Sequence, residues 1–234
     1  MRIFLGFIIL FVGLLTNATS KQISAFEILN LPAENRKFAA LESGADLIKE
    51  LRVLANDQQN TMSVRWKALM LMTELNPKES IQDLLKAVHS PEWYMRNAGL
   101  VGLQSIYKEK ALEVAQDLIK DKALVVRSAA VELLSQNLSP MNREILWQEF
   151  YMKYNFRAEQ SLWIRTQILK ALSTKPKDSE SQTFIGLLKE KDSNIQYVSV
   201  LALEKLHGIK LGNEQSTVMQ KISLWQDYSR KNAL

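Results

Sequence analysis

The stretch that decides the fold reads Val126-Arg127-Ser128-Ala129-Ala130-Val131-Glu132-Leu133-Leu134. Its first, fifth and ninth residues are apolar, which is the spacing of a helix with one buried face. Four further segments align with it without a gap, and they begin at Val64, Met95, Ile164 and Ile195. The five starts are separated by 31, 31, 38 and 31 residues, and this regular spacing predicts a repeat protein.

The aligned columns have the chemistry of a helix packed inside a stack. Counting the start as position 0, the residue there is aliphatic or methionine, and position 8 is apolar in all five copies. Position 4 is small in four copies, which carry Ala68, Gly99, Ala130 and Ser199. Small residues at the centre of an apolar stripe let neighbouring helices approach closely. Each copy is therefore predicted to be a helix that buries positions 0, 4 and 8.

A shorter amphipathic helix precedes each copy, so the repeating unit is a helix pair. Its apolar stripe is clearest between Ile81 and Val88. Pro77 and Pro140 stand where such helices would begin, and the first turn is where a helix tolerates proline best. Neither helix can bury its stripe alone, so the pairs must stack on one another.

The pattern aliphatic-Arg-x-Ala-Ala-x-x-x-Leu, met most cleanly at residues 126–134, resembles the second helix of a HEAT repeat. The similarity extends over about residues 44–207. The resemblance implies an all-α fold, a right-handed α-solenoid of about five HEAT-like helix pairs with capping helices at both ends. It also implies a protein-binding scaffold. The fifth copy departs from the pattern because Gln196 replaces the arginine, and the preceding aspartate is clear only as Asp121 and Asp192. We therefore do not expect a continuous arginine–aspartate ladder.

The repeats and their caps form a single predicted domain, residues 21–234. We expect the helix pairs at about residues 44–76, 77–107, 108–138, 139–174 and 175–207. One short helix after Pro32 is expected to cap the N-terminal end, and a helix over about residues 213–231 the C-terminal end. End units of a solenoid are atypical because one of their faces must meet water.

Residues 1–20 have the layout of a secretory signal peptide. Arg2 is followed by an unbroken apolar run from Ile3 to Leu15 and then by small polar residues up to Ser20. The run is short for a membrane-spanning helix, which needs about 20 apolar residues. We therefore expect an exported protein, periplasmic or secreted. An uncleaved segment that anchors the chain in a membrane through residues 3–15 is the alternative.

The composition limits the classes of function. The chain has no cysteine, which excludes a disulfide framework and a thiolate metal site. The net charge of +5 is spread along the chain without a block of lysine and arginine, so nucleic acid is not an expected partner. No nucleophile elbow, phosphate loop or zinc-protease motif occurs. His89 and His207 stand apart from other ligand types and are expected in the last turns of helices. Neither an enzyme nor a metal or other cofactor is expected.

In four of the five copies an arginine follows position 0, namely Arg65, Arg96, Arg127 and Arg165. Some HEAT-like proteins act on DNA, for which such a column could serve. A residue that nearly every repeat carries is more simply explained by packing or pairing within the stack. We interpret the arginines in this second way.

The candidate binding surface follows from helix geometry. If positions 0, 4 and 8 face the core, positions 2, 6 and 9 lie on the opposite flank, and the HEAT resemblance places that flank on the concave side of the stack. We call this set the second-helix strip: Trp66, Met70, Thr73, Asn97, Val101, Gln104, Ser128, Glu132, Ser135, Thr166, Lys170, Ser173, Tyr197, Leu201 and Glu204. Trp66 and Tyr197 are either anchors for a partner protein or lids over the ends of the core, and both interpretations stay open.

The 38-residue spacing marks a second irregularity. Seven extra residues fall within 141–161, a segment that contains Leu146, Trp147, Phe150, Tyr151, Tyr154 and Phe156. Either the helix here is longer and buries a larger patch of core, or the segment presents Trp147 and Tyr154 to a partner as an aromatic knob.

These features favour an exported scaffold whose partner is another protein. A narrower version is an inhibitor or self-protection protein directed at an envelope enzyme. A membrane-anchored structural component of an envelope assembly is the alternative from a different class.

Overall fold

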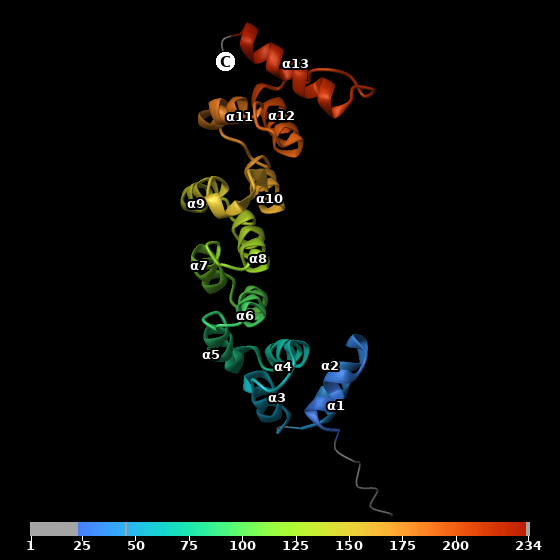
Figure 1. Ribbon diagram of the computed structural model, residues 1–234. Coiled ribbons are helices and arrows are strands. Elements are labelled where there is room, and N and C mark those ends of the chain that lie inside the picture. The colour runs from blue at the N-terminus through green and yellow to red at the C-terminus, as the bar shows by residue number, and fades with distance from the viewer. Residues whose placement is uncertain (1–22, 45, 233–234) are drawn as a thin grey trace, which may run out of the picture.

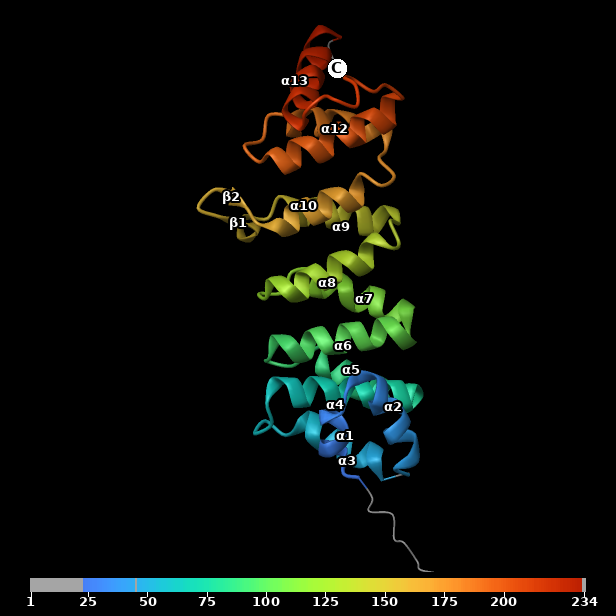
Figure 2. The ribbon, with the colours of Figure 1, turned by 90° about the vertical axis from the view of Figure 1, so that its right-hand side faces the viewer.

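The computed structural model describes residues 23–44 and 46–232, and nearly all of its regular structure is helical. The helices form a single stack of antiparallel pairs (Figures 1 and 2). The five pairs are α3 (Leu47–Asn56) with α4 (Met62–Leu75), α5 (Pro77–Ala87) with α6 (Trp93–Ile106), α7 (Lys108–Leu118) with α8 (Leu124–Ser135), α9 (Pro140–Phe150) with α10 (Trp163–Leu172), and α11 (Ser181–Leu187) with α12 (Ser193–His207). The predicted all-α solenoid of helix pairs is confirmed. The predicted signal peptide lies outside the described residues.

The core is the predicted stripe. In the third pair Val126, Ala130 and Leu134 are completely buried, and only one stripe residue in the five pairs, Val64, is partly exposed. Gly99 shows why the centre of the stripe has to be small. A Cβ atom at Gly99 would lie 2.8 Å from the carbonyl oxygen of Leu84, so the backbones of α5 and α6 could not approach as they do.

The first helices of the second and fourth pairs begin at their prolines, as predicted. Pro77 and Pro140 occupy the first turn, where a helix has no use for the missing N–H. Asn76 and Ser139 stand directly before them, and each accepts a hydrogen bond from the backbone N–H three residues further on. These caps fix where α5 and α9 start.

The helix predicted after Pro32 is present in the N-terminal cap, but the cap also contains a second helix before Pro32, which the sequence analysis missed. The two helices are α1 (Ala25–Asn30) and α2 (Ala33–Glu42), with Pro32 between them. The first forms because Ser24 and Glu27 make a capping box. The Glu27 N–H donates to the Ser24 hydroxyl, and the Ser24 N–H donates to the Glu27 carboxylate.

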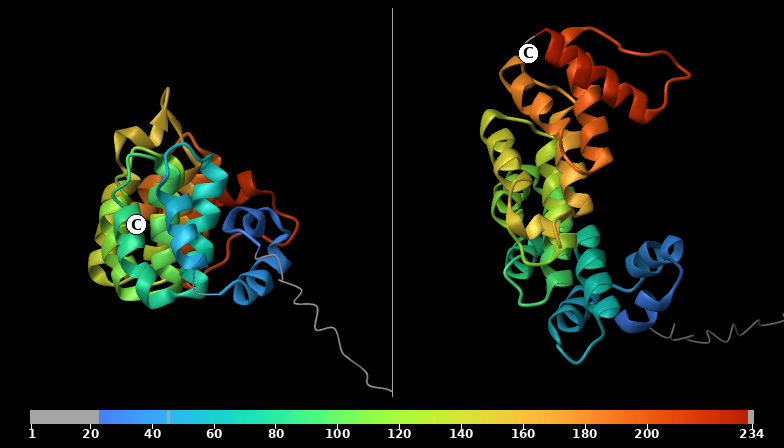
Figure 3. Two further views of the ribbon diagram at one scale, coloured as in Figure 1. Left: turned by 90° about the horizontal axis from the view of Figure 1, so that it is seen from below. Right: turned by 45° about the horizontal axis from the view of Figure 1, so that its top comes forward.

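The two ends of the stack turn toward the same side. The C-terminal helix α13 (Val218–Lys231) and the α1–α2 unit both project on the side of the second helices α4, α6, α8, α10 and α12 (Figure 1; Figure 3, right). An ion pair of 2.8 Å between Lys37 and Glu74 ties α2 to α4. The molecule is therefore a bracket whose concave side is the layer of second helices.

The seven extra residues of the fourth pair do not lengthen a helix, so that alternative is wrong. With 11 residues, α9 is as long as α5 and α7. The extra residues form the short 3-10 helix η1 (Lys153–Asn155) and a hairpin of β1 (Phe156–Arg157) and β2 (Gln160–Ser161). The helix stops because Asn155 folds back and its side-chain NH2 donates to the carbonyl oxygen of Glu149, at 2.8 Å. The hairpin projects from the edge where the turns within the pairs lie (Figure 2).

Candidate protein-binding surface

The arginine column is buried, and it joins each helix pair to the next. Each guanidinium reaches a carboxylate of the following pair. The four contacts are Arg65–Glu92 at 2.9 Å, Arg96–Asp121 at 2.5 Å, Arg127–Glu149 at 3.8 Å and Arg165–Glu190 at 2.9 Å. The interpretation of pairing within the stack is confirmed. As expected, arginine–aspartate pairs do not form a continuous ladder, since only Arg96 meets an aspartate. In the other three contacts of this arginine ladder, a glutamate supplies the carboxylate from another position.

The ladder ends where the fifth copy lacks its arginine. The side-chain amide of Gln196 donates to the carbonyl oxygen of Leu188, at 3.0 Å within its own pair. Gln226 of α13 donates to the same carbonyl at 2.7 Å. An arginine at position 196 would need a carboxylate from the unit that follows. That unit, α13, supplies Gln226 instead, so the neutral amide of Gln196 suits this position.

Opposing contributions set the pKa of the buried carboxylates Asp121, which belongs to this ladder, and Glu180, which pairs with Arg143 outside it. Burial alone would raise the pKa of Asp121, but hydrogen bonds from Arg96 and from the Ala123 N–H hold it below its ordinary value. Glu180 behaves in the same way. Burial favours its neutral form, whereas Arg143 and the Trp147 indole N–H stabilise the charged form and lower its pKa. Both groups are structural carboxylates, fully occupied by internal partners.

The second-helix strip lies on the concave layer, and most of it is accessible. Positions 2 and 6 of all five copies are exposed or half-buried. Position 9 is less uniform. Thr73 and Ser173 are buried, and their hydroxyls donate to backbone carbonyl oxygens of their own helices. The prediction that these two residues lie on the accessible flank is therefore wrong. Distributed along this layer, on the second helices from α4 to α12, are Trp66, Met70, Asn97, Gln104, Ser128, Glu132, Thr166, Lys170 and Tyr197.

The two aromatic residues of the strip are covered by the core on one side and accessible on the other. Trp66 and Tyr197 are each half-buried and pack against the core, so part of each ring covers the ends of the stack. The remainder of each ring is accessible to solvent. In the middle of the strip, the Ser128 hydroxyl donates to Gln167 at 3.0 Å and fixes α8 to α10.

Four apolar side chains that the sequence reading missed extend the strip toward the beginning of the second helices. They are Met62, Trp93, Val125 and Trp163, each roughly half exposed. Each stands three or four residues before position 2, and residues with that spacing share a helix face. The sequence offered a sign of this extension, because four copies have a large apolar residue one or two places before position 0.

Trp147 and Tyr154 lie away from the strip, on the first-helix side and in the insertion. The Trp147 indole N–H donates to Glu180 at 2.7 Å, and its ring stacks on Tyr151. The Tyr154 hydroxyl donates to Glu149 at 2.7 Å, and its ring lies over the Arg127 guanidinium. Both residues therefore have internal partners, although Tyr154 stays 40% exposed.

The histidines have separate surroundings. His207 is the last residue of α12, as predicted, and its Nε2 lies 3.1 Å from the Ser181 hydroxyl. His89 is exposed in the turn just beyond the end of α5, rather than in its last turn. Over residues 23–44 and 46–232, no three acidic or histidine side chains gather as ligands for a metal ion. Within the same ranges, no helix combines the length and the apolar character needed to span a bilayer.

Comparison with known proteins bears on the first three helix pairs. Residues 46–135 match the family model of HEAT repeats, and this segment runs from α3 to the end of α8. The pairs α9–α10 and α11–α12 continue the same arrangement beyond it. No curated protein matches the chain.

Proposed function

We propose that this HEAT-repeat protein is an exported scaffold that holds another protein against its second-helix strip. HEAT-repeat solenoids are typically non-catalytic and commonly mediate protein–protein interaction. One observation carries the proposal for this chain. The strip, with its aromatic and apolar side chains, lies along the concave layer between two terminal units that both project on that side.

Burial and exposure on the strip suit a protein partner. Binding hot spots are enriched in tryptophan and tyrosine whose rings are rigid and can be fully desolvated by the partner. Trp66 and Tyr197 are already held by the core on one side, so little side-chain entropy is lost when the other side is covered. The polar residues between them supply hydrogen-bonding groups, and Glu132 and Lys170 supply charges of both signs.

The test uses a double variant of the two anchors. Trp66→Ala with Tyr197→Ala should weaken capture of the natural partner from the native envelope by on the order of 2 kcal/mol, or roughly thirtyfold. Tyr107→Ala is the matched control, because Tyr107 is an exposed aromatic residue outside the strip. Ser128 is unsuitable as a control, since it is bonded to Gln167. Unchanged capture by the double variant, with a strong loss of thermal stability, would mean that the rings are only lids.

Export is part of the proposal and has its own test. The apolar run from Ile3 to Leu15 with its small polar exit supports a cleaved signal peptide. The mature protein should begin at Thr19 or Lys21 and fractionate as soluble. An intact N-terminus in the membrane fraction would instead support the structural envelope component. A narrower proposal, an inhibitor or self-protection protein, predicts that the purified protein slows the captured partner if that partner is an envelope enzyme.

A further inference from the structure

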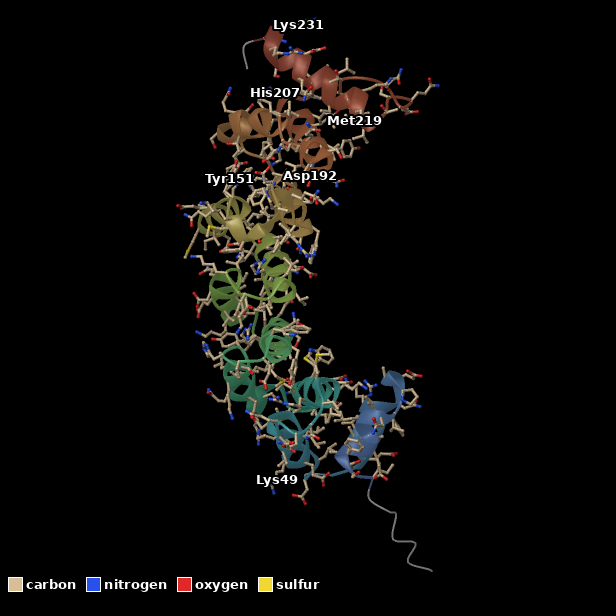
Figure 4. All side chains as sticks on the ribbon, viewed as in Figure 1. Lys49, Tyr151, Asp192, His207, Met219 and Lys231 are labelled. Carbon is tan, nitrogen blue, oxygen red and sulfur yellow. The ribbon has the colours of Figure 1, made fainter. Side chains whose placement is uncertain are left out.

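An open groove lies between the β hairpin and the fifth helix pair. Its volume is about 1290 Å³. One wall is the hairpin turn with β2, and the other is α11 with the turn that leads to α12. Tyr151 and Asp192, which belong to its lining, both lie where the fourth pair meets the fifth (Figure 4). No residue of the second-helix strip lines it, so the groove is a separate surface.

The hairpin presents an unpaired main-chain edge to this groove. In the hairpin Phe156 lies opposite Ser161. The neighbouring pair, Asn155 with Leu162, is hydrogen-bonded, since the Leu162 N–H donates to the Asn155 carbonyl oxygen at 2.9 Å. Hydrogen-bonded and non-bonded pairs alternate in an antiparallel ladder. The Phe156–Ser161 pair is therefore the non-bonded one, and the N–H and C=O of Ser161 point away from β1. Because β2 lines the groove and β1 does not, these two groups face it.

The opposite wall lacks a side chain at its centre. A Cβ atom on Gly186 would meet no atom within 4 Å, so packing inside the chain does not require glycine there. Glycine within a helix is less favourable than alanine by roughly 1 kcal/mol. The equivalent positions of the second and third pairs, nine residues before position 0, carry the exposed side chains of Lys86 and Asp117. Glycine in the fifth pair therefore widens the groove without relieving any clash.

A buried polar cluster fixes the hairpin wall. Glu149 is 2% exposed and accepts hydrogen bonds from the Tyr154 hydroxyl at 2.7 Å and the Asn155 amide at 2.8 Å. The Arg165 guanidinium packs against the Phe156 ring, 4.1 Å from its centroid, directly beneath the strand. A wall that is held in this way loses little conformational entropy when a ligand binds.

The groove is lined by the acidic side chains of Glu159, Glu190 and Asp192 and by two lysines, of which Lys191 is paired with Glu159 at 3.4 Å. Glu190 is paired with Arg165 at 2.9 Å, and Asp192 accepts the Asn194 N–H at the start of α12. Lys189 is exposed and takes part in no ion pair among the described residues. An acidic group on the ligand would find its partner there.

We propose that this groove binds an extended peptide segment of a partner protein by β-strand addition. The segment pairs with the main chain of Ser161, places a small residue over Gly186 and sets a carboxylate beside Lys189. Main-chain hydrogen bonds supply affinity in this mode of recognition, and the opposite wall supplies selectivity. The site is independent of the second-helix strip, so either can fail without the other.

The probe is a library of short random-sequence peptides displayed on phage and selected against the whole protein. Enriched peptides, once synthesised, should share one acidic residue at a fixed position and should bind about tenfold or more weakly to Gly186→Leu. N-methylation of one peptide amide should cause a similar loss, because it removes the hydrogen bond to Ser161. The amide resonance of Ser161 should shift on titration.

The matched control is Asp117→Leu, which adds the same side chain at the equivalent exposed position of the third pair. It should bind the enriched peptides as the wild type does, and both variants should melt as the wild type does. The proposal is overturned if no peptide is enriched, if Gly186→Leu binds as well as the wild type, or if each amide tolerates N-methylation. Loss of stability in Gly186→Leu would show that residue 186 is not open, and would also overturn it.

Discussion

The arginine at position 1 couples each helix pair to the next, and Arg96 does so most completely. Its guanidinium donates to both oxygens of Asp121, at 2.5 and 2.7 Å, and to the carbonyl oxygens of Ser90 and Pro91. Arg96→Ala should cost about 3–5 kcal/mol, because it leaves a buried carboxylate without its partner. Chemical denaturation measures the loss. Adding Asp121→Ala should restore part of it, and a single-variant loss below about 1 kcal/mol would contradict the argument.

Carboxylates that pair with arginine, within the ladder and outside it, make the stability of the fold depend on pH. The pKa values of Glu92, Asp121 and Glu180 are lowered in the fold, so their contribution is complete above the ordinary carboxyl pKa of about 4. This contribution to stability is lost as the pH falls through the lowered pKa values that these groups have in the folded state. The melting temperature should hold between about pH 5 and 7 and decrease below about pH 4. The difference between wild type and Glu180→Gln should narrow over the acidic range, and a constant difference would count against this account.

Among the elements, the hairpin has the most evident local strain. Its turn residues Ala158 and Glu159 have φ values of 47° and 65°, the left-handed conformation of a type I′ turn. Ala158→Asn with Glu159→Gly introduces the pair that this turn favours, and should stabilise the protein by about 1 kcal/mol. The exposed contact of Glu159 with Lys191 contributes little, so its loss should not mask the gain. A lower denaturation midpoint would mean that the turn is not the strained site.

The elements differ in how far the sequence could predict them. The second helices were predictable because a buried stripe such as Val126, Ala130 and Leu134 leaves a periodic mark on a dozen residues. The hairpin was not, since two-residue strands have no period and Ala158-Glu159 is an unusual turn pair. The helix α1 could have been predicted, because Ser24 followed three residues later by Glu27 is the sequence pattern of a capping box. The groove and the ladder join residues some 25 to 30 positions apart, which no local pattern reports.

At the scale of the whole molecule, the stack unfolds according to its weakest interface. Each helix pair contacts mainly its neighbours, so a break in the middle separates two short arrays. Val126→Asp places a carboxylate without a partner at a fully buried site and should cost several kcal/mol of a typical total of about 5–15 kcal/mol. Circular dichroism should show the loss of a cooperative helical melt. An unchanged melt would contradict the burial of the stripe at this position.

The arginine ladder runs in one direction, from each pair to the following one, and this polarity determines how the array could grow by duplication. A copied unit inserted between the second and third pairs would bring both an arginine for its successor and a carboxylate for its predecessor. A unit appended after the fifth pair would find Gln196 and Gln226 sharing the Leu188 carbonyl, with no guanidinium to receive its carboxylate. Longer forms of this protein should therefore arise by internal duplication, and the α13 terminus should stay the fixed end.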